Sequence, residues 1–309
     1  MSFAFVFPGQ GSQSVGMMTA YGDAPVVRQT FEEASAALGE DLWQMVVEGP
    51  AERLAQTVNT QPVMLAAGVA VWRLWQAKGG RAPAVMAGHS LGEYAALVAA
   101  GALAFTDAVP LVRLRAQAMQ EAVPVGTGAM AAVLGLDDEQ IAAACVEAAN
   151  GEVVEAVNFN AVGQTVIAGH KAAVERAIEA CKARGAKRAI SLPVSAPFHS
   201  SLMRPAAERL GERLKAIEIR PPTIPVINNV DVAVESDPAR IKDALVRQAF
   251  SPVRWVEIVR RMSAMGVTTT AECGPGKVLA GVAKRCADGV SGLALADEAA
   301  LVAATSNLE

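Results

Sequence analysis

A serine between two glycines, at the junction of an apolar run and an alanine-rich segment, is the feature that most constrains this chain. Gly88-His-Ser-Leu-Gly92 follows the apolar run Ala84–Ala87 and precedes Glu93–Ala104, a segment with almost no polar face. The run predicts a buried parallel strand, and the segment predicts a helix. At a strand-to-helix turn, G-x-S-x-G is the nucleophile elbow, in which glycines allow a turn tight enough to expose the serine hydroxyl. The alternative is a glycine-rich turn with a capping serine, but the flanking strand and helix favour a reactive Ser90.

Helices alternating with short apolar strands favour a parallel α/β sheet in two blocks of the chain. In the first block, predicted helices span Pro25–Leu38, Pro62–Lys78, Leu91–Ala100 and Thr106–Glu121, and predicted strands span Phe3–Phe7 and Ala84–Ala87. In the second block, predicted helices span Ser201–Ile217, Pro238–Phe250, Val253–Met265 and Pro275–Cys286, and predicted strands span Ile224–Asn228 and Val267–Glu272. From Ala287 the chain is weakly patterned, and we expect a partly mobile tail. Together, residues 1–124 and 196–309 predict one discontinuous, α/β-hydrolase-like catalytic domain.

The order of predicted strands and helices changes between the two blocks, after the turn-rich segment Pro124–Gly128. The predicted segments are a strand at Ala129–Leu134, a helix at Asp138–Ala149, strands at Val153–Asn158 and Gln164–Ala168, a helix at Lys171–Arg184 and a strand at Arg188–Leu192. The order β-α-β-β-α-β is the ferredoxin-like unit. Residues 125–195 are therefore predicted to form a small ferredoxin-like domain inserted into the large one.

The composition excludes several classes of function. A net charge of −4 gives no reason to expect nucleic-acid binding. Four widely spaced cysteines without C-x-x-C indicate free thiols in a reducing compartment, and three histidines without H-E-x-x-H give no metal-binding motif. No apolar run is long enough for a signal or membrane segment. We therefore expect a cytoplasmic monomer that binds neither nucleic acid nor membrane and holds no metal.

Ser90 needs a base, because a serine hydroxyl is a poor nucleophile until its proton is removed. His89 is expected on the opposite side of the elbow, and His170 lies at a helix start, where a capping or surface role fits better. His199 lies in the proline-containing loop 195–200, where the chain leaves the small domain, and such loops commonly carry catalytic groups. His199 is therefore the predicted base. No acid lies at a strand end of the large domain between Ser90 and His199, so we expect a Ser-His pair whose imidazole is oriented by a group other than a carboxylate.

The loop Phe7–Gln13 follows the first predicted strand and is rich in glycine. It fails as a dinucleotide loop because position 14 is Ser where G-x-G-x-x-G requires Gly, and it fails as a P-loop because no Lys follows. Its backbone N–H groups are instead expected at the carboxyl edge of the sheet, beside Ser90. An oxyanion hole is needed at that place.

Several motifs along the chain resemble one known family. In order they are Phe7–Gln13, Gly88-His-Ser-Leu-Gly-Glu-Tyr94, Arg113–Gln120, Gly126–Met130, Ala196-Pro-Phe-His-Ser200, Gln248–Pro252 and Gly274–Val278. They resemble the malonyl-CoA:acyl carrier protein transacylases, the malonyl-loading acyltransferases of bacterial fatty acid synthesis, and the resemblance extends from residue 3 to about residue 286. It implies ping-pong transfer of malonyl from malonyl-CoA to the phosphopantetheine thiol of acyl carrier protein, without a cofactor.

The resemblance also implies a role for each matched residue. Ser90 would carry the malonyl ester, and His199 would be the base, oriented by the backbone carbonyl of Gln248. The N–H groups of Gln10 and Leu91 would form the oxyanion hole. The family pattern therefore supplies the orienting group that the search for an acid did not find.

The substrate-binding residues implied by the resemblance are Arg115, Phe198 and Gln248. Arg115 would hold the malonyl carboxylate, and its planar, always charged guanidinium suits that task on chemical grounds alone. A surface position is the alternative for Arg115, but apolar neighbours on its predicted helix favour partial burial. Phe198 resembles the malonyl-selective form of its loop. The family's usual proline in the small-domain hairpin is Val162 here, which affects only the expected shape of that turn.

Three other functions compete with malonyl transfer. A serine esterase or thioesterase would share the elbow but gives no role to Arg115. A catalytically silent scaffold for a carrier protein would not need Ser90 and His199, and an acyltransferase for another acyl group would differ only in its pocket. An acidic carrier protein needs a positive surface, for which the basic cluster 182–188 is the predicted site, with Arg204 and Arg209 as alternatives.

Overall fold

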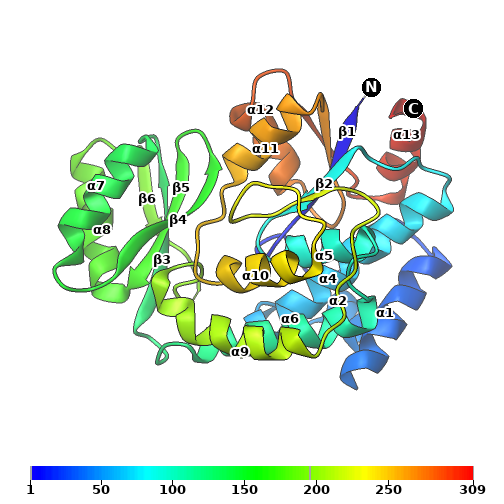
Figure 1. Ribbon diagram of the computed structural model, residues 1–309, viewed down its shortest axis with the longest axis horizontal. Helices are drawn as coiled ribbons and strands as arrows, with labels where there is room; N and C mark the ends of the chain where they lie inside the picture. Colours follow the sequence, from blue (N-terminus) through cyan, green and yellow to red (C-terminus); the bar gives the residue numbers. More distant parts are fainter. Residues whose placement is uncertain (1, 195, 309) are drawn as a thin grey trace.

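The computed structural model describes residues 2–194 and 196–308, and it contains two β-sheets of different kinds (Figure 1). One sheet has the strand order β7-β2-β1-β8-β9, and all of its pairings are parallel. Its strands are β1 (Phe3–Phe7), β2 (Val85–Gly88), β7 (Val226–Ile227), β8 (Thr269–Glu272) and β9 (Ser291–Ala294). The other sheet is antiparallel, with the order β4-β5-β3-β6. The predicted α/β class with a parallel sheet is confirmed.

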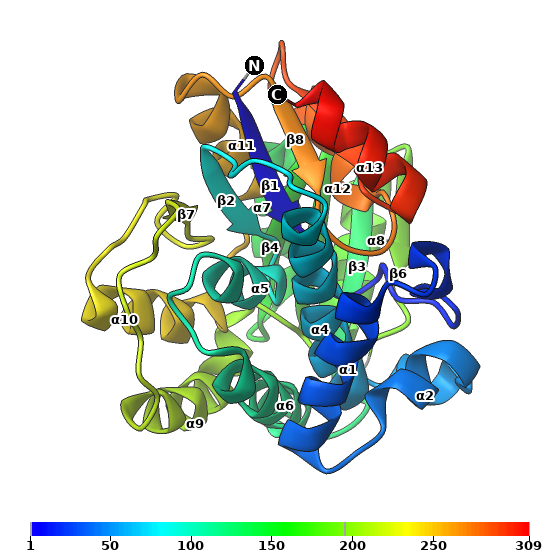
Figure 2. The same ribbon diagram turned by 90° about the vertical axis from the view of Figure 1, so that its right-hand side faces the viewer.

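β1 is buried along its whole length because helices cover both faces of the parallel sheet (Figure 2). The three phenylalanines of β1 point to one face, where Phe5 packs edge-on against Trp72 and Trp75 with ring centroids 5.6 and 5.1 Å apart. Ala4 and Val6 alternate with them and belong to a separate apolar cluster on the other face. A strand buried on both faces reads as a continuous apolar run, which is how β1 appears in the sequence.

Most helices lie on the phenylalanine face of the sheet. They are α1 (Pro25–Leu38), α2 (Leu42–Glu48), α3 (Ala51–Leu54), α4 (Thr57–Ala77), α5 (Gly92–Ala99), α6 (Phe105–Glu121), α9 (Arg204–Lys215), α10 (Pro238–Gln248) and α13 (Glu298–Asn307), with 3₁₀ turns at Thr19–Tyr21 and Ser201–Met203. The helices α11 (Trp255–Ala264) and α12 (Val278–Cys286) cover the other face. Nearly every residue of α4 is buried, since it packs against α1, α5 and α6 at once.

The antiparallel sheet and its two helices form the other half of the molecule, on the left of Figure 1. The elements are, in chain order, β3 (Gly128–Leu134), α7 (Asp138–Ala149), β4 (Val154–Ala161), β5 (Gln164–His170), α8 (Lys171–Ala183) and β6 (Arg188–Ser191). A capping box of Asp137 and Gln140 fixes the start of α7. Both helices pack on one face of the sheet, while Met130 and Val166 on its other face pack with Phe198.

The strand β4 joins the two halves by hydrogen bonds to Val253, which precedes α11. The N–H of Val253 donates to the carbonyl of Val157 (2.8 Å), and the N–H of Phe159 donates to the carbonyl of Val253 (3.0 Å). These bonds form an isolated parallel bridge between Asn158 and Val253, which ties the edge strand β4 to the large half. The predicted domain boundary falls on Ser195, which lies outside the described residues.

The tail from Ala287, for which the sequence predicted no regular element, contains a strand and a helix. Ser291–Ala294 forms the edge strand β9 beside β8, and Glu298–Asn307 forms the helix α13, which begins with a side-chain cap from Asp297. The alanine-rich α13 has little amphipathic contrast, so periodicity does not reveal it. Leu301 and Ala304 are nevertheless buried in the main core.

Several predicted boundaries differ from the structure. The helix expected from Pro62 begins five residues earlier, at Thr57, and holds Pro62 inside it, while α2 and α3 were not expected at all. The strand expected over Ile224–Asn228 contains only Val226–Ile227, and the helix expected from Ser201 begins as a 3₁₀ turn. Short elements are set by tertiary contacts more than by local pattern.

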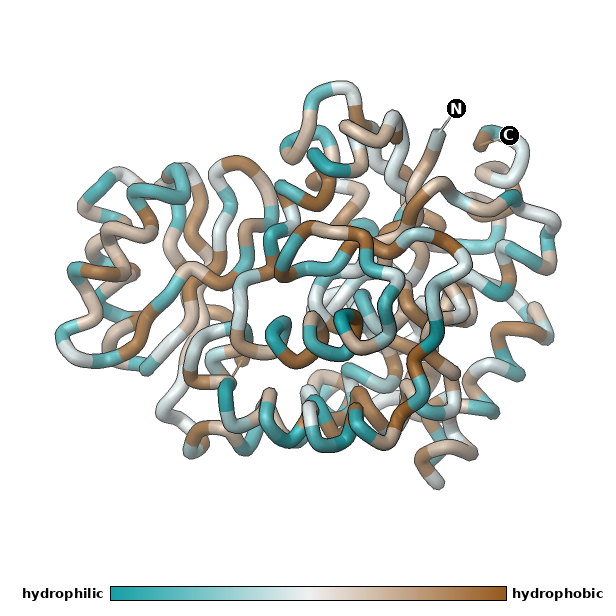
Figure 3. Tube along the Cα trace, viewed as in Figure 1, coloured by the Kyte–Doolittle hydropathy of each residue, from teal (hydrophilic) through white to brown (hydrophobic). Residues whose placement is uncertain are grey.

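Hydrophilic residues gather on the outward turns of peripheral helices such as α9, along the lower edge of Figure 3. Apolar segments run through the interior instead. Within residues 2–194 and 196–308, no helix is both long enough and apolar enough to cross a membrane.

Candidate active site

The turn between β2 and α5 holds Ser90 in a strained conformation, with φ of +52°, a region that residues other than glycine rarely adopt. A Cβ at Gly88 would lie 1.8 Å from the backbone of Gly92, and a Cβ at Gly92 would lie 2.1 Å from the carbonyl oxygen of Phe7. Neither position has room for any side chain. Strand, turn and helix therefore form the elbow that the sequence predicts, and the Ser90 side chain projects into a cavity.

His199 is in contact with the serine. Its Nε2 lies 2.7 Å from the Ser90 Oγ, and its Nδ1 lies 2.9 Å from the backbone carbonyl oxygen of Gln248. Because a carbonyl can only accept, Nδ1 carries the proton and Nε2 is free to accept from the serine hydroxyl. The orienting group is a backbone carbonyl, in the place where other serine enzymes use a carboxylate.

Burial, reinforced by the positive charge of Arg115, lowers the pKa of His199 from 6.5 to about 3. The imidazole is therefore neutral at physiological pH. A neutral imidazole already bonded to the serine hydroxyl needs no prior loss of a proton to act as a base.

Arg115 reaches the same point from α6. Its Nη1 donates to Gln61 Oε1 (2.9 Å), and its Nη2 donates to Gln248 Oε1 (3.0 Å) and to Ser90 Oγ (3.1 Å). The side chain is only 2% exposed, so it is buried more completely than its apolar sequence neighbours suggested. All three of these bonds go to neutral oxygens. A buried guanidinium bonded to neutral groups is well suited to receive an anion.

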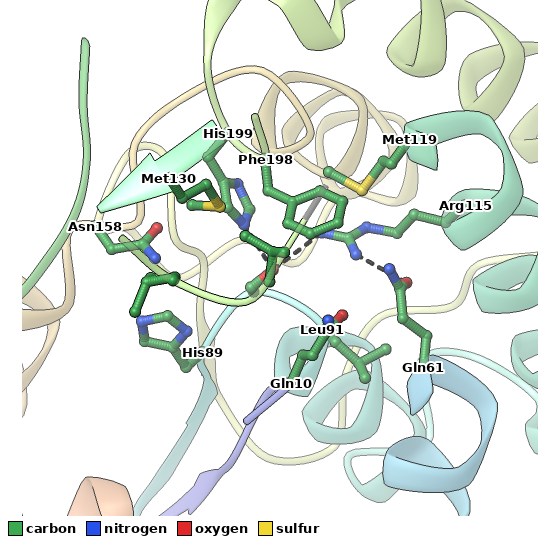
Figure 4. A pocket seen from close by; sticks show the side chains of 13 residues that line it. Gln10, Gln61, His89, Leu91, Arg115, Met119, Met130, Asn158, Phe198 and His199 are labelled. Atoms are coloured by element: carbon green, nitrogen blue, oxygen red, sulfur yellow. Dashed lines mark hydrogen bonds between the residues drawn. The ribbon is translucent and has the colours of Figure 1, made fainter. Parts of the chain in front are cut away.

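The cavity is lined by residues from both halves of the molecule (Figure 4). Its volume is about 130 Å³, and its lining comprises Gln10, Gln61, His89, Ser90, Leu91, Arg115, Met119, Met130, Asn158, Leu192, Val194, Phe198 and His199. The predicted residues Gln10, Leu91 and Phe198 are among them. Within the described residues, the backbone N–H groups of Gln10 and Leu91 donate to no protein acceptor, so both are open to a ligand. The arrangement suits a short acyl group.

A second cavity of about 210 Å³ adjoins the first and shares Gln10, His89, Asn158 and Leu192 with it. It runs past Asn160 and Trp255 toward α12. Its wall contains both amide side chains, such as Asn160 and Gln164, and apolar side chains, such as Val166 and Leu279. Such a lining fits an extended arm that carries both amide and methylene groups.

Gln248 is not among the residues that line either cavity, although it was predicted to bind substrate. It is fully buried, and its side chain bonds to Arg115, to the Ser90 carbonyl and to Glu93. The structure thus places Gln248 behind the site, where it contacts the reactive groups.

Three further residues support the site without having been identified in the sequence. Asn229 accepts from the Ser90 N–H (2.7 Å) and donates to the Gly88 carbonyl (2.7 Å), which clamps the elbow. Glu93 is buried beside it, and Gln61 holds Arg115. The sequence signals for these residues were weak. Gln61 is a polar residue within a buried helix, and Asn229 belongs to an asparagine pair that follows an apolar run.

The other two histidines lie away from the serine hydroxyl. His89 Nε2 lies 2.8 Å from Asn160 Oδ1, and His170 Nδ1 accepts from the N–H of Val153 (2.9 Å). His89 lines the same cavity as Ser90, although it was expected on the opposite side of the elbow. His170 precedes α8 but makes no side-chain cap bond, and it is half-buried. In the described part of the chain, no three His, Cys, Asp or Glu side chains lie close enough together to hold a metal ion.

The basic cluster 182–188 lies at the end of α8 and the start of β6. Lys182 pairs with Glu179 and Arg184 pairs with Glu147, so part of its charge is neutralised within the same half. Arg204 and Arg209 were the alternative positive sites for a carrier protein. Arg209 pairs with Glu121, and Arg204 lies over the ring of Phe250.

Comparisons with known proteins agree with this geometry. The model of the acyl transferase domain family matches residues 4–303. Malonyl CoA-acyl carrier protein transacylase of Salmonella typhimurium is 59% identical over 303 residues, which are 98% of each chain. The crystal structure of an acyl-carrier-protein S-malonyltransferase from Burkholderia pseudomallei is 61% identical, with a TM-score of 0.97, and the match covers 99% of this chain and 100% of that one.

A further solved structure contains a carrier protein. It is a malonyl-transacylase in complex with a type II PKS acyl-carrier protein, 55% identical, with a TM-score of 0.98 and coverage of 99% and 100% of the two chains. These matches extend over almost the whole chain, including every element that builds the cavity. The chain therefore belongs to the acyl transferase family and, within it, to the malonyl CoA-acyl carrier protein transacylases.

Proposed function

We propose that this protein transfers a malonyl group from malonyl-CoA to the phosphopantetheine thiol of an acyl carrier protein through a malonyl ester on Ser90. The observation that carries the proposal is the contact of Arg115 with the Ser90 hydroxyl at 3.1 Å, in the cavity of about 130 Å³. A malonyl group bound to Ser90 places its free carboxylate a few bonds from the ester, within reach of that guanidinium. A hydrolase for uncharged esters has no use for a buried cation at this place.

The first half-reaction forms the malonyl ester. His199 Nε2 takes the proton of the Ser90 hydroxyl as Oγ attacks the thioester carbonyl of malonyl-CoA. The N–H groups of Gln10 and Leu91 donate to the oxyanion of the tetrahedral intermediate. The carbon–sulfur bond then breaks, and the thiolate of CoA leaves with the proton that His199 had taken.

The second half-reaction is the reverse with another thiol. The thiol of the carrier protein's phosphopantetheine gives its proton to His199 and attacks the ester carbonyl. The bond to Ser90 Oγ breaks, and His199 returns the proton to the serine. Because CoA and the carrier carry the same pantetheine arm, one channel serves both, and the second cavity is the proposed path. No cofactor takes part in this sequence.

Arg115 and Phe198 set the acyl group that is accepted. The Arg115 guanidinium pairs with the malonyl carboxylate, a charge-assisted bond strengthened by burial. The ring of Phe198 lies on the cavity wall beside His199, where it limits the space for a branched acyl group. Both side chains therefore favour malonyl over acetyl and over bulkier acyl groups.

We also propose a division into two domains: an α/β-hydrolase-like catalytic domain of residues 1–124 and 196–309, and a ferredoxin-like domain of residues 125–195. Support comes from the strand order β4-β5-β3-β6, with both helices on one face, and from the parallel sheet that carries the elbow. The cavity is lined from both, so the small domain forms one wall of the site. We place the protein as a cytoplasmic monomer that supplies fatty acid synthesis.

The mass of the intact protein tests the covalent step. After brief mixing with malonyl-CoA, the wild-type protein should gain about 86 Da, one malonyl group, and Ser90→Ala should gain nothing. An adduct that persists in Ser90→Ala would place the ester elsewhere. Rapid release of free malonate without a thiol acceptor would favour a thioesterase.

A further inference from the structure

Glu93 is a buried carboxylate that the reaction does not use. It lies near the start of α5, is 2% exposed and lines neither cavity. Its Oε2 accepts from the backbone N–H of Asn229 (2.9 Å) and from Nε2 of Gln248 (2.9 Å). Burying a carboxylate is costly unless donors compensate for the lost water, so this arrangement calls for an explanation.

The bond to Glu93 fixes which way the Gln248 amide points. Its Nε2 faces two acceptors, the Glu93 carboxylate and the Ser90 carbonyl (2.9 Å), while its Oε1 faces the Arg115 guanidinium (3.0 Å). Turning the amide over would place its NH₂ group against the guanidinium donors and its oxygen against two acceptors. Above its raised pKa of about 7, Glu93 is a carboxylate with no proton to donate, and this ionised form opposes the turned state directly.

Glu93 thereby acts on Arg115 through one intervening amide. A direct Glu93–Arg115 ion pair would compete with the carboxylate of the acyl group for the same guanidinium. With Gln248 between them, the acid steadies the position of the arginine, and the guanidinium bonds to Gln61, Ser90 and Gln248 but not to Glu93. Arg115 can then pair with the carboxylate of the substrate.

We propose that Glu93 is a positioning residue that orients the Arg115 guanidinium through the Gln248 amide and so sets the preference for a carboxylated acyl group. The inference rests on the proposed function. It requires that loss of the Glu93 side chain lowers kcat/KM for malonyl-CoA more than kcat/KM for acetyl-CoA, because only the malonyl group bonds to Arg115.

The experiment measures kcat/KM of acyl-enzyme formation with malonyl-CoA and acetyl-CoA and follows the ratio of the two values. Glu93→Ala should lower the ratio by about tenfold or more, as expected for a lost bond to a charged group. Glu93→Gln can accept both bonds through its amide oxygen, and its ratio should stay within about threefold of wild type. An equal loss with both donors in Glu93→Ala would overturn the proposal.

A double mutant tests the route through Gln248. If Glu93 acts through the Gln248 amide, Glu93→Ala should change the ratio little in a protein that already carries Gln248→Ala. The ratio of the double mutant Glu93→Ala/Gln248→Ala should therefore match that of Gln248→Ala within about threefold. If the fold-loss in the ratio for the double mutant equalled the product of the losses in the two single mutants, Glu93 and Gln248 would act independently, and the proposal would be overturned. If Glu93→Ala does not fold, Glu93→Asp decides, because it withdraws the carboxylate by one methylene; an unchanged ratio there overturns the proposal.

Glu272 provides the matched control. It is also a buried carboxylate, but its Oε2 accepts from the N–H of Ala280 at the start of α12 (2.8 Å), away from Arg115. Glu272→Ala, the same change as Glu93→Ala, should leave the ratio unchanged, and a tenfold change in the ratio would overturn the proposal. A wild-type protein that forms no malonyl adduct would overturn the proposed function itself, a result distinct from a normal adduct with an unchanged ratio in Glu93→Ala.

Discussion

His199 and Glu93 are buried within one hydrogen-bonded network, and burial moves their pKa values in opposite directions. Burial and the charge of Arg115 lower the pKa of His199 to about 3, whereas burial raises the pKa of Glu93 from 4.5 to about 7, against the bonds from Gln248 and Asn229 and the charge of Arg115. Desolvation disfavours whichever form is charged. The base is therefore kept neutral, while the supporting acid titrates near neutral pH.

The pH dependence of acylation follows from these directions. A lowered pKa means that His199 stays unprotonated as the pH falls through 6.5 and is lost as a base only near pH 3. In Glu93→Gln, which cannot titrate at position 93, kcat/KM for malonyl-CoA should stay within about threefold between pH 5 and 8. Stopped-flow acylation across this range provides the measurement. If kcat/KM fell tenfold for each pH unit below 6.5, His199 would titrate with the pKa of an ordinary histidine, which would contradict this prediction.

In the proposed function, Arg115 binds the carboxylate of the substrate. A hydrogen bond to a charged group contributes about 1.5–3 kcal/mol, so Arg115→Ala should lose about 10–100-fold in kcat/KM for malonyl-CoA. Acetyl-CoA has no carboxylate, and its use should hold steady or rise. Both values come from acyl-enzyme formation with each donor.

Arg113 is a suitable control for this change, since it lies on the same helix and pairs with Glu40 at 2.9 Å. Arg113→Ala should leave the preference between donors unchanged. An equal loss with both donors in Arg115→Ala would assign that arginine to the fold or to the CoA contact.

At the scale of the elements, the tight turn between β2 and α5 depends on two glycines. Gly88→Ala puts a Cβ 1.8 Å from the backbone of Gly92, which cannot move without displacing α5. Overpacking of this kind costs about 1–3 kcal/mol or more of unfolding free energy. Gly281→Ala, on an exposed turn of α12 with nothing within 4 Å, should be neutral or stabilising by up to about 1 kcal/mol. Denaturant unfolding of both variants checks this, and a neutral Gly88→Ala would contradict the packing argument.

The elements that the sequence predicted are those whose pattern is local. The strand β1 and the elbow were found because a continuous apolar run and a G-x-S-x-G motif need no distant partner to be recognised. The edge strand β9 and the helix α13 were missed because their place is decided by β8 and by the core beneath Leu301.

The same distinction holds for the site. Ser90, His199 and Arg115 were identified from motifs, and the structure brings them together. Asn229 and Glu93 act through contacts with residues more than 130 positions away. Asn229 carries no local motif, and Glu93 lies within the motif Gly88–Tyr94, where nothing in the sequence assigns it a contact with the site. Their part in the site could not be predicted from one sequence.

At the scale of the whole molecule, the reactive groups sit where two sheets meet. The elbow comes from the parallel sheet, and the apolar face with Met130 comes from the antiparallel one, which β4 ties to Val253. The basic cluster 182–188 lies on the antiparallel half, and as the docking surface for a carrier protein it stays a prediction.

The most direct test of this account is a single-turnover chase. The malonyl-enzyme is formed, freed of CoA, and mixed with acyl carrier protein that bears a phosphopantetheine thiol, and the masses of both proteins are followed. The account predicts that the enzyme loses about 86 Da as the carrier gains the same mass, with little free malonate. Release of malonate to water, or a carrier that gains mass only when CoA is restored, would contradict it.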